Sequence, residues 1–217
     1  MTQPADAYDA WYHTERGRWI GETEYRLIYK YLQPHHGTSL LDVGCGTGYF
    51  SRRFAQDGLA VTGIDADAAM IDYACERRWG SENYQIADAR RLPFDDKSFD
   101  YSVAITSLCF ITEQQQVLAE MARVTRTRMA LGLLNHHSVL YRQKGRCGGS
   151  GAYRGAYWHR PQEVRELLQH VGLDQFKLSS AIFLPNGRPA TRWIESVLPD
   201  SVLYGGFLLV VASLPNT

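Results

Sequence analysis

The stretch Leu40–Phe50, LLDVGCGTGYF, decides the fold of this chain. An apolar run ends in the acid Asp42 and is followed by Gly44, Gly46 and Gly48 at alternate positions. Glycines this close together cost backbone entropy, and they suit a turn at which another group approaches the main chain. The pattern therefore predicts a strand that passes through a tight turn into a helix, with a ligand held at the turn.

Strand-like runs and helical patterns alternate along the rest of the chain. Asp67 and Thr112 are residue types that cap helices, Pro161 suits a first helical turn, and Gly58 and Gly172 suit helix ends. The strand-like runs are SLLDV, AVTGI, NYQIA, FDYSVAI and RMALGLL, with two more around residues 176–184 and 206–213. This alternation predicts an α/β fold with a mostly parallel sheet covered by helices on both faces. Ligands of such sheets bind outside the carboxyl ends of the strands.

Two segments fall outside this alternation. Residues 1–33 predict an N-terminal helical cap, whose apolar face would carry Leu27, Ile28, Tyr31 and Leu32. Residues 135–160 form a long connection rich in glycine, histidine and arginine, and long connections in compact domains are usually functional or disordered. We expect this segment to cover a substrate, with a further wall from residues 185–201 that includes Trp193. At 217 residues, we expect a single domain over residues 1–217.

Composition and cysteine spacing exclude several classes. The 23 basic and 23 acidic residues cancel, which argues against a nucleic-acid binder, including an RNA methylase. The four cysteines form no CxxC pair, and His136, His137, Cys147 and His159 lack any usual zinc spacing, so we expect reduced thiols and no metal. No secretory leader and no apolar run long enough to span a bilayer is visible, so we expect a cytoplasmic protein. We also expect it to be a monomer or a homodimer.

The glycine motif fits some cofactors poorly. A phosphate-binding P-loop would need a lysine and a hydroxyl residue where Tyr49 and Phe50 stand, so that interpretation fails. A dinucleotide fingerprint would place its third glycine at Tyr49, one residue after Gly48. Asp65, at the end of the second strand-like run, can accept hydrogen bonds from both hydroxyls of a ribose and disfavours a ribose phosphate. The pattern thus favours an unphosphorylated nucleoside.

Three blocks in order carry a resemblance to a known family. They are LLDVGCGTGYFS, VTGIDADAAMIDYA and ADARRLPFDDKSFDYSVAITSLCFI, between about Leu40 and Ile111. Together they resemble the motif series of class I S-adenosylmethionine-dependent methyltransferases, and more narrowly the type 11 group related to ubiquinone and menaquinone biosynthesis methyltransferases. The resemblance implies a Rossmann-like fold: a seven-stranded sheet of order 3-2-1-4-5-7-6 with an antiparallel last strand.

The resemblance also implies roles for individual residues. The loop beneath the methionine part of S-adenosylmethionine would be shaped by Asp42, Gly44, Gly46 and Gly48. Asp65 would hold the ribose, with Ala66 and Met70 beside the adenine. The remaining contacts would come from Asp88 and Ala89 at the adenine edge, from Thr106 and Leu108 at the methionine part, and from Arg18 and Trp19 in the cap.

Methyl transfer from a sulfonium depends mostly on alignment, so no unmistakable catalytic residue is required. Proton-handling candidates in the 135–160 connection are His136, His137, Tyr153 and His159. TSLC stands where methylases of base and glutamine amino groups carry [DN]PP[YF], so we expect a small-molecule acceptor and S-adenosylhomocysteine as product. Two alternatives stay open: a non-catalytic cofactor-binding subunit of a partner enzyme, and an NAD-dependent oxidoreductase.

Overall fold

The computed structural model describes residues 4–215, and its centre is one seven-stranded sheet. The strands are β1 (Ser39–Val43), β2 (Ala60–Asp65), β3 (Asn83–Ile86), β4 (Phe99–Ile105), β5 (Thr125–Leu134), β6 (Phe176–Ala181) and β7 (Phe207–Ser213). Their order is β3-β2-β1-β4-β5-β7-β6, as the resemblance implied. Strand β7 runs antiparallel to both β5 and β6, and the pairs among β1 to β5 are parallel. The predicted topology is confirmed.

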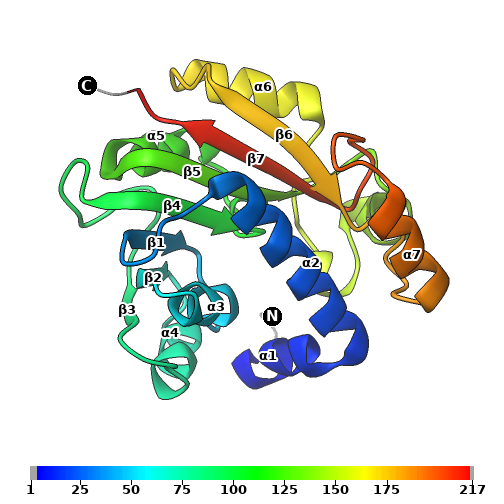
Figure 1. Cartoon of the computed structure of the whole chain (residues 1–217), viewed down its shortest axis with the longest axis horizontal. Helices are drawn as coiled ribbons and strands as arrows, with labels where there is room; N and C mark the ends of the chain where they lie inside the picture. Colours follow the sequence, from blue (N-terminus) through cyan, green and yellow to red (C-terminus); the bar gives the residue numbers. More distant parts are fainter. Residues whose placement is uncertain (1–3, 216–217) are drawn as a thin grey trace.

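Helices cover both faces of this sheet (Figure 1). They are α1 (Ala5–His13), α2 (Glu15–Leu32), α3 (Tyr49–Gln56), α4 (Ala68–Glu76), α5 (Gln114–Val124), α6 (Pro161–His170) and α7 (Pro189–Val197). Side chains of α2 and α3, such as Ile28 and Phe54, form one apolar core against the sheet. Side chains of α5 and α6, such as Leu118 and Leu168, form another core on the opposite face. The sheet is therefore buried on both sides, which explains its nearly continuous apolar strands.

Most of the predicted helix signals hold, and one is wrong. The side chain of Asp67 accepts a hydrogen bond from the Ala69 N–H and caps α4, and Pro161 is the first residue of α6. Helix α5 begins at Gln114 after Glu113, so Thr112 is one residue too far upstream to cap it. Thr112 is exposed and faces the crevice described below.

The N-terminal helical cap consists, within residues 4–33, of the two helices α1 and α2. Thr14 separates the two helices because its backbone is extended. Its hydroxyl accepts a hydrogen bond from the Gly17 N–H at the start of α2. Leu27, Ile28 and Leu32 are buried against the sheet as the pattern predicted, whereas Tyr31 is only partly buried. Helix α2 packs on β5, β6 and β7, whereas α1 contacts α4, which packs on β2 and β3. The two helices therefore extend from one end of the strand order toward the other.

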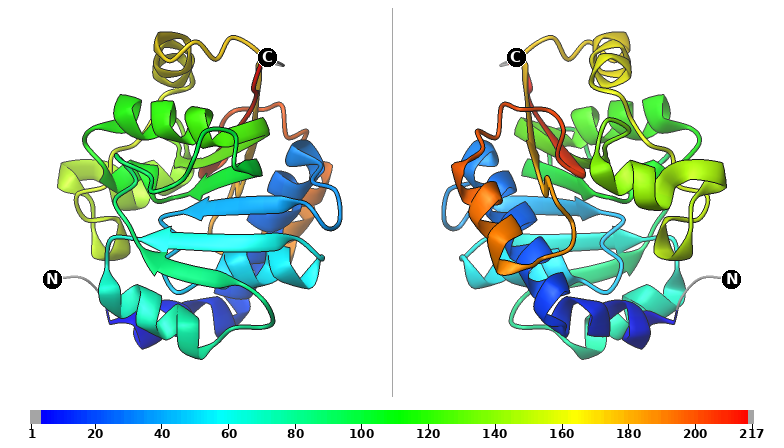
Figure 2. Two further views of the ribbon diagram at one scale, coloured as in Figure 1. Left: turned by 90° about the vertical axis from the view of Figure 1, so that its left-hand side faces the viewer. Right: turned by 90° about the vertical axis from the view of Figure 1, so that its right-hand side faces the viewer.

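Residues 135–160 are an ordered connection of short helical turns. A π-type turn covers Tyr141–Gly145, and 3-10 turns cover Arg146–Gly148 and Gly151–Tyr153. Figure 2 shows the carboxyl ends of β1 and β2 pointing toward the edge where this yellow-green segment and the beginning of α1 lie. The sheet edge that carries the glycine motif is thus enclosed by two segments that are distant in sequence.

Candidate active site

A crevice of about 520 Å³ opens at the carboxyl ends of β1 to β4. The glycine turn and the end of β2 form part of its wall, and residues after β3 and β4 complete it. Most of the residues proposed for the cofactor from sequence line this crevice: Gly44, Gly46, Asp65, Ala66, Met70, Asp88, Ala89 and Thr106. Because the carboxyl ends of parallel strands meet at one edge, these dispersed positions converge there.

The three positions of the motif require glycine for different physical reasons. All three adopt positive φ angles, of 72° at Gly44, 53° at Gly46 and 77° at Gly48. A Cβ on Gly44 would lie 2.3 Å from the Cβ of Ser107, and a Cβ on Gly48 would lie 2.7 Å from the Tyr84 hydroxyl. These two glycines are therefore required by packing within the chain.

Gly46 is different because its missing side chain would point toward open space. The nearest atom to a Cβ on Gly46 is a ring carbon of Tyr8, 3.8 Å away. The Gly46 N–H donates to Asp65 Oδ2 at 2.9 Å, and the Asp67 N–H donates to Asp65 Oδ1 at 2.9 Å. The turn after β1 is thus tied to the end of β2, and a cradle remains that a larger residue would fill. A nucleoside cofactor fits this arrangement.

The two other acids of the motif series have contrasting environments. Asp42 is buried beneath the turn, where the Ser51 hydroxyl donates to its Oδ2 at 2.6 Å. Burial, with a smaller contribution from the charge of Asp65, raises the pKa of Asp42 to about 7. Asp88 is exposed and paired with the Arg90 guanidinium, which lowers the pKa of Asp88 to about 2. Only Asp88 of these two reaches the crevice.

Five residues named from the resemblance do not line the crevice. Asp42 and Gly48 lie beneath the turn, and Leu108 is fully buried in the apolar core beside α5. Arg18 is exposed on α2, and its guanidinium donates to the carbonyl of His13 at 3.4 Å. Trp19 also lies away from the crevice, with the Arg192 guanidinium 5.8 Å from its ring centroid. The list of residues outside the crevice is thus Asp42, Gly48, Leu108, Arg18 and Trp19, of which Asp42 and Gly48 support the glycine turn.

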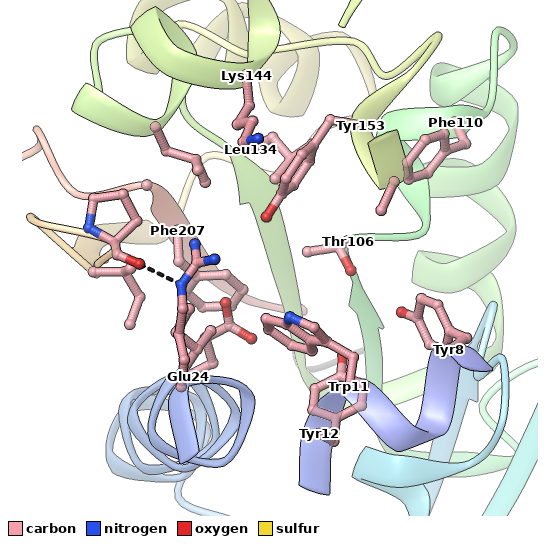
Figure 3. Close-up of a pocket in the computed structure, with 17 residues that line it drawn as sticks. Tyr8, Trp11, Tyr12, Glu24, Thr106, Phe110, Leu134, Lys144, Tyr153 and Phe207 are labelled. Carbon is pink, nitrogen blue, oxygen red and sulfur yellow. Dashed lines mark hydrogen bonds between the residues drawn. The ribbon is translucent and has the colours of Figure 1, made fainter. Parts of the chain in front are cut away.

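A second cavity, of about 230 Å³, adjoins the crevice (Figure 3). Its walls come from α1, α2, the turn after β4, the 135–160 connection and the residues around β7. Most lining side chains are apolar or aromatic, and the polar ones are few: Arg16, Glu24, Thr106, Lys144 and the tyrosines 8, 12 and 153. A mainly apolar cavity with a few polar groups is typical of a small-molecule site.

Tyr8, Thr106 and Phe110 line both the crevice and the cavity. Burial is the largest cause that raises the pKa of Tyr8, and the charges of Glu24 and Asp65 raise it further. Glu24 lines the cavity and Asp65 lines the crevice, so the pKa of Tyr8 depends on an acid from each site. These three residues form a wall that the two sites share.

Two strained residues border the cavity. Thr106 has a φ of 55° and Ile182 has a φ of 64°, although both are β-branched. The Thr106 N–H donates to the Gly132 carbonyl at 2.7 Å. Glu195 accepts from the N–H groups of Ile182 and Phe183 at 2.7 and 2.9 Å. Such strain costs about 1–3 kcal/mol per residue and persists where surrounding contacts enforce it, often at functional sites.

Of the four candidates for proton handling, only Tyr153 lines the cavity. Burial raises the pKa of its hydroxyl to about 12, so this group keeps its proton at neutral pH. His159 is buried beside Cys109 and Gln114, and burial lowers its pKa to about 4. His136 and His137 line a separate surface depression with Tyr141, Arg142, Arg146 and Tyr204. Within residues 4–215, no group of three or more histidine, cysteine, aspartate or glutamate side chains could hold a metal ion.

Sequence reasoning missed the most distinctive polar group of the cavity, Glu24. A usable signal exists, because Ile20, Glu24 and Ile28 are spaced by four residues and share one helix face. Ile20 and Ile28 are buried, so an acid between them marks an unusual position. Trp193, in contrast, was expected at a substrate wall, and its side chain is 66% exposed on α7. Pro185, in the turn before that helix, lines the cavity instead.

Comparisons with known proteins agree with this architecture. Residues 41–130 match a family described as a methyltransferase domain. A malonyl-[acyl-carrier protein] O-methyltransferase of Serratia marcescens is 37% identical over 126 residues, which cover 58% of this chain and 47% of that protein. An O-methyltransferase of Penicillium expansum, cnsE, is 34% identical over 113 residues, covering 49% and 41%. The chain spans about half the length of the curated relatives it matches.

Solved structures share the fold across nearly the whole chain. An S-adenosylmethionine-dependent methyltransferase of Thermotoga maritima, described as a possible histamine N-methyltransferase, superposes with a TM-score of 0.78 at 20% identity, covering 97% of this chain and 95% of that one. Phosphoethanolamine N-methyltransferase 2 of Haemonchus contortus, solved with S-adenosyl-L-methionine, gives a TM-score of 0.69 at 16% identity, covering 99% and 60%. Residues 41–130 therefore match a methyltransferase domain, and the chain as a whole shares the fold of these solved methyltransferases.

Proposed function

We propose that this chain binds S-adenosylmethionine in the crevice and transfers its methyl group to a small molecule in the adjoining cavity. The observation that carries the proposal is the wall of Tyr8, Thr106 and Phe110 shared by the two sites. Transfer between two bound molecules requires that their reacting ends meet, and residues that line both sites mark the place where the two sites adjoin. The chain forms one methyltransferase domain, with residues 1–33 as its cap and residues 135–160 as its substrate cover.

In this proposal different crevice residues contact different parts of the cofactor. Asp65 accepts hydrogen bonds from the ribose hydroxyls, and Ala66 and Met70 lie against the adenine. Asp88 and Ala89 border the adenine edge, where the Asp88 carboxylate must keep a free lone pair beside its Arg90 partner. Gly46 leaves room for the methionine part. Asp42, Gly44 and Gly48 act indirectly, because they hold the turn in shape.

S-adenosylmethionine, when bound, supplies a methyl group on a sulfonium whose sulfur leaves as a neutral thioether. The residues of the chain therefore need only to align the acceptor and exclude water, and alignment alone can be worth several kcal/mol. Tyr153 offers the acceptor a hydrogen-bond donor, since its raised pKa of about 12 keeps it protonated. The hydrogen bond from the Thr106 N–H to the Gly132 carbonyl holds Thr106 at the shared wall, in a backbone conformation that is strained for a β-branched residue.

The acceptor must be small, because the cavity of about 230 Å³ lies below the range of roughly 300–1,000 Å³ that holds drug-sized ligands. The curated relatives named above are O-methyltransferases, one of them named for a malonyl group on acyl-carrier protein, which supports transfer to a small acceptor group rather than to a nucleic acid. Within residues 4–215, none of the helices combines the length and apolarity that a bilayer crossing needs.

The first experiment is a calorimetric titration of the purified chain with S-adenosylmethionine, S-adenosylhomocysteine and NADH in parallel. We expect binding of the first two and no heat from NADH. Binding of NADH alone would contradict the cofactor assignment and support the oxidoreductase alternative. A chain that binds S-adenosylmethionine but needs a co-purified partner for any methyl transfer would instead be the non-catalytic subunit.

A further inference from the structure

Glu24 is the acidic side chain among the residues that line the acceptor cavity. Glu24 lies on α2 between the buried residues Ile20 and Ile28, and Figure 3 shows its carboxylate directed into the cavity. Within the part of the chain that the structure describes, no side chain forms an ion pair or hydrogen bond with it, and burial is the one cause that raises its pKa, to about 8. Glu24 is partly buried, and with this pKa its carboxyl group is mostly protonated at pH 7. A cationic ligand that pairs with it favours the carboxylate form and recovers the free-energy cost of removing that charge from water.

The two cations that line the same cavity do not neutralise Glu24. The Arg16 guanidinium donates through Nε to the Pro185 carbonyl at 2.5 Å, which holds it against the turn before α7. Lys144 belongs to the 135–160 connection, and its residue is exposed to solvent at the cavity wall opposite α2 in Figure 3. Neither cation contributes to the pKa of Glu24. The acid is therefore left for a ligand to pair with.

The aromatic lining around this acid suits a cation as well. Trp11, Tyr12, Tyr153 and Phe207 line the cavity with Glu24. Aromatic faces attract ammonium groups, with a gain that grows when the pair is removed from water. Burial is the largest cause that raises the pKa of Tyr12 and of Tyr153, and the negative charge of Glu24 raises both further, which places both rings within its electrostatic reach. A carboxylate within an aromatic enclosure is complementary to a protonated amine.

Glu24 lies apart from the place where the methyl group would be transferred. The wall shared with the cofactor crevice consists of Tyr8, Thr106 and Phe110, whereas Glu24 does not line the crevice. In Figure 3 its carboxylate lies on the side of the cavity away from Phe110 and Tyr8. An acceptor held at Glu24 would thus direct its opposite end toward the shared wall.

We propose that the methyl acceptor is a small molecule with an aromatic or apolar body and a protonated amine, and that Glu24 is the residue that selects it by binding this amine. The inference rests on the proposed function, because it names the substrate class of the same site. Glu24 acts in binding and specificity, and the methyl group is received at the other end of the acceptor.

The test compares three probes of similar shape that differ in charge: 2-phenylethylamine, 2-phenylethanol and 3-phenylpropionate. Each is titrated into the full chain saturated with S-adenosylhomocysteine, for the native sequence and for Glu24→Gln. We expect the amine to bind at least tenfold more tightly than the alcohol, because a charge-assisted pair replaces a neutral contact. In Glu24→Gln this preference falls to within about threefold.

A matched control removes the same charge elsewhere on α2. The Glu15 side chain is 86% exposed at the start of that helix and pairs with Arg192 outside the cavity. Glu15→Gln should keep the amine preference of the native chain. An unchanged melting temperature and an unchanged affinity for S-adenosylhomocysteine in Glu24→Gln would show that the variant is folded and that its cofactor site is intact.

Each contrary result has a distinct meaning. If the amine binds no more tightly than the alcohol, including the case in which neither binds measurably, the inference is overturned. Preference for 3-phenylpropionate also overturns it, because Arg16 and Lys144 would then set the charge of the acceptor. Failure to bind S-adenosylhomocysteine at all would remove the proposed function itself, before any probe is added.

Discussion

The carboxylate of Asp65 holds the backbone of Gly46, because Asp65 Oδ2 accepts the Gly46 N–H at 2.9 Å. The same carboxylate receives the Asp67 N–H on its other oxygen. One side chain at the end of β2 therefore fixes the glycine turn after β1 and the start of α4. A ligand that reaches Asp65 meets a group whose orientation is already set by two backbone donors.

Asp65→Ala should weaken binding of S-adenosylhomocysteine by about 10–100-fold. The variant loses hydrogen bonds to a charged group, worth about 1.5–3 kcal/mol, and releases the Gly46 N–H. Calorimetric titration measures the affinity. Asp72, an exposed acid on α4, provides the control, since Asp72→Ala should leave the affinity unchanged. Equal affinities for Asp65→Ala and the native chain would remove the ribose assignment.

Gly44→Ala should destabilise the fold by several kcal/mol. The new Cβ would lie 2.3 Å from the Ser107 Cβ, and the φ of 72° adds about 1–2 kcal/mol of backbone strain. Urea denaturation measures the loss. The double variant Gly44→Ala, Ser107→Gly should recover part of the free energy of unfolding, because the clashing atom is gone. No recovery would mean that backbone strain alone accounts for the effect.

Gly46→Ala should act on binding more than on stability. Its Cβ would meet only the Tyr8 ring at 3.8 Å, so the cost to folding is the strain of a left-handed residue, about 1–2 kcal/mol. The added methyl group enters the crevice, and we expect the affinity for S-adenosylhomocysteine to fall at least tenfold. Denaturation and titration of the same preparation separate the two effects. A variant that binds normally would place the cofactor elsewhere in the crevice.

Asp42→Asn should stabilise the protein at pH 8 and not at pH 4. The pKa of Asp42 is raised from 3.8 to about 7 in the folded state, so folding favours its protonated form. The contribution of Asp42 to stability is therefore fully present below pH 4 and is lost as pH rises through 7, by at most about 4 kcal/mol for a shift of about three units. Asparagine can still accept the Ser51 hydrogen bond. Thermal unfolding of both chains at the two pH values gives the difference, and a pH-independent difference would contradict the raised pKa.

His159→Gln should remove a pH dependence of the opposite sign. Burial lowers the pKa of His159 from 6.5 to about 4, so the folded state resists its protonation. Its contribution to stability is present above pH 6.5 and is lost as pH falls toward 4, by at most about 3 kcal/mol. Unfolding between pH 7 and pH 4 should be less pH-dependent in the variant than in the native chain. Parallel curves for the two chains would mean that His159 does not cause the loss.

Local signals in the sequence determined much of this protein. The alternation of apolar runs and helical patterns specified the parallel sheet and its covering helices, because each element shows its own periodicity. The glycine motif located the turn after β1, and Asp65 followed at the end of β2. The resemblance supplied the strand order and the antiparallel β7, which the alternation alone does not specify.

Only the tertiary structure decided the acceptor cavity. Tyr8 and Glu24 come from the N-terminal helices, Tyr153 from a connection more than a hundred residues later, and Phe207 from β7. No local pattern encodes that such residues meet, because their proximity follows from the packing of α2 on β5 to β7. The same holds for Gly44 and Ser107, whose contact joins the ends of β1 and β4. The sequence by itself determined the elements and the cofactor motif, whereas the shape and charge of the acceptor site depend on contacts between distant segments, which exist only once the chain is folded.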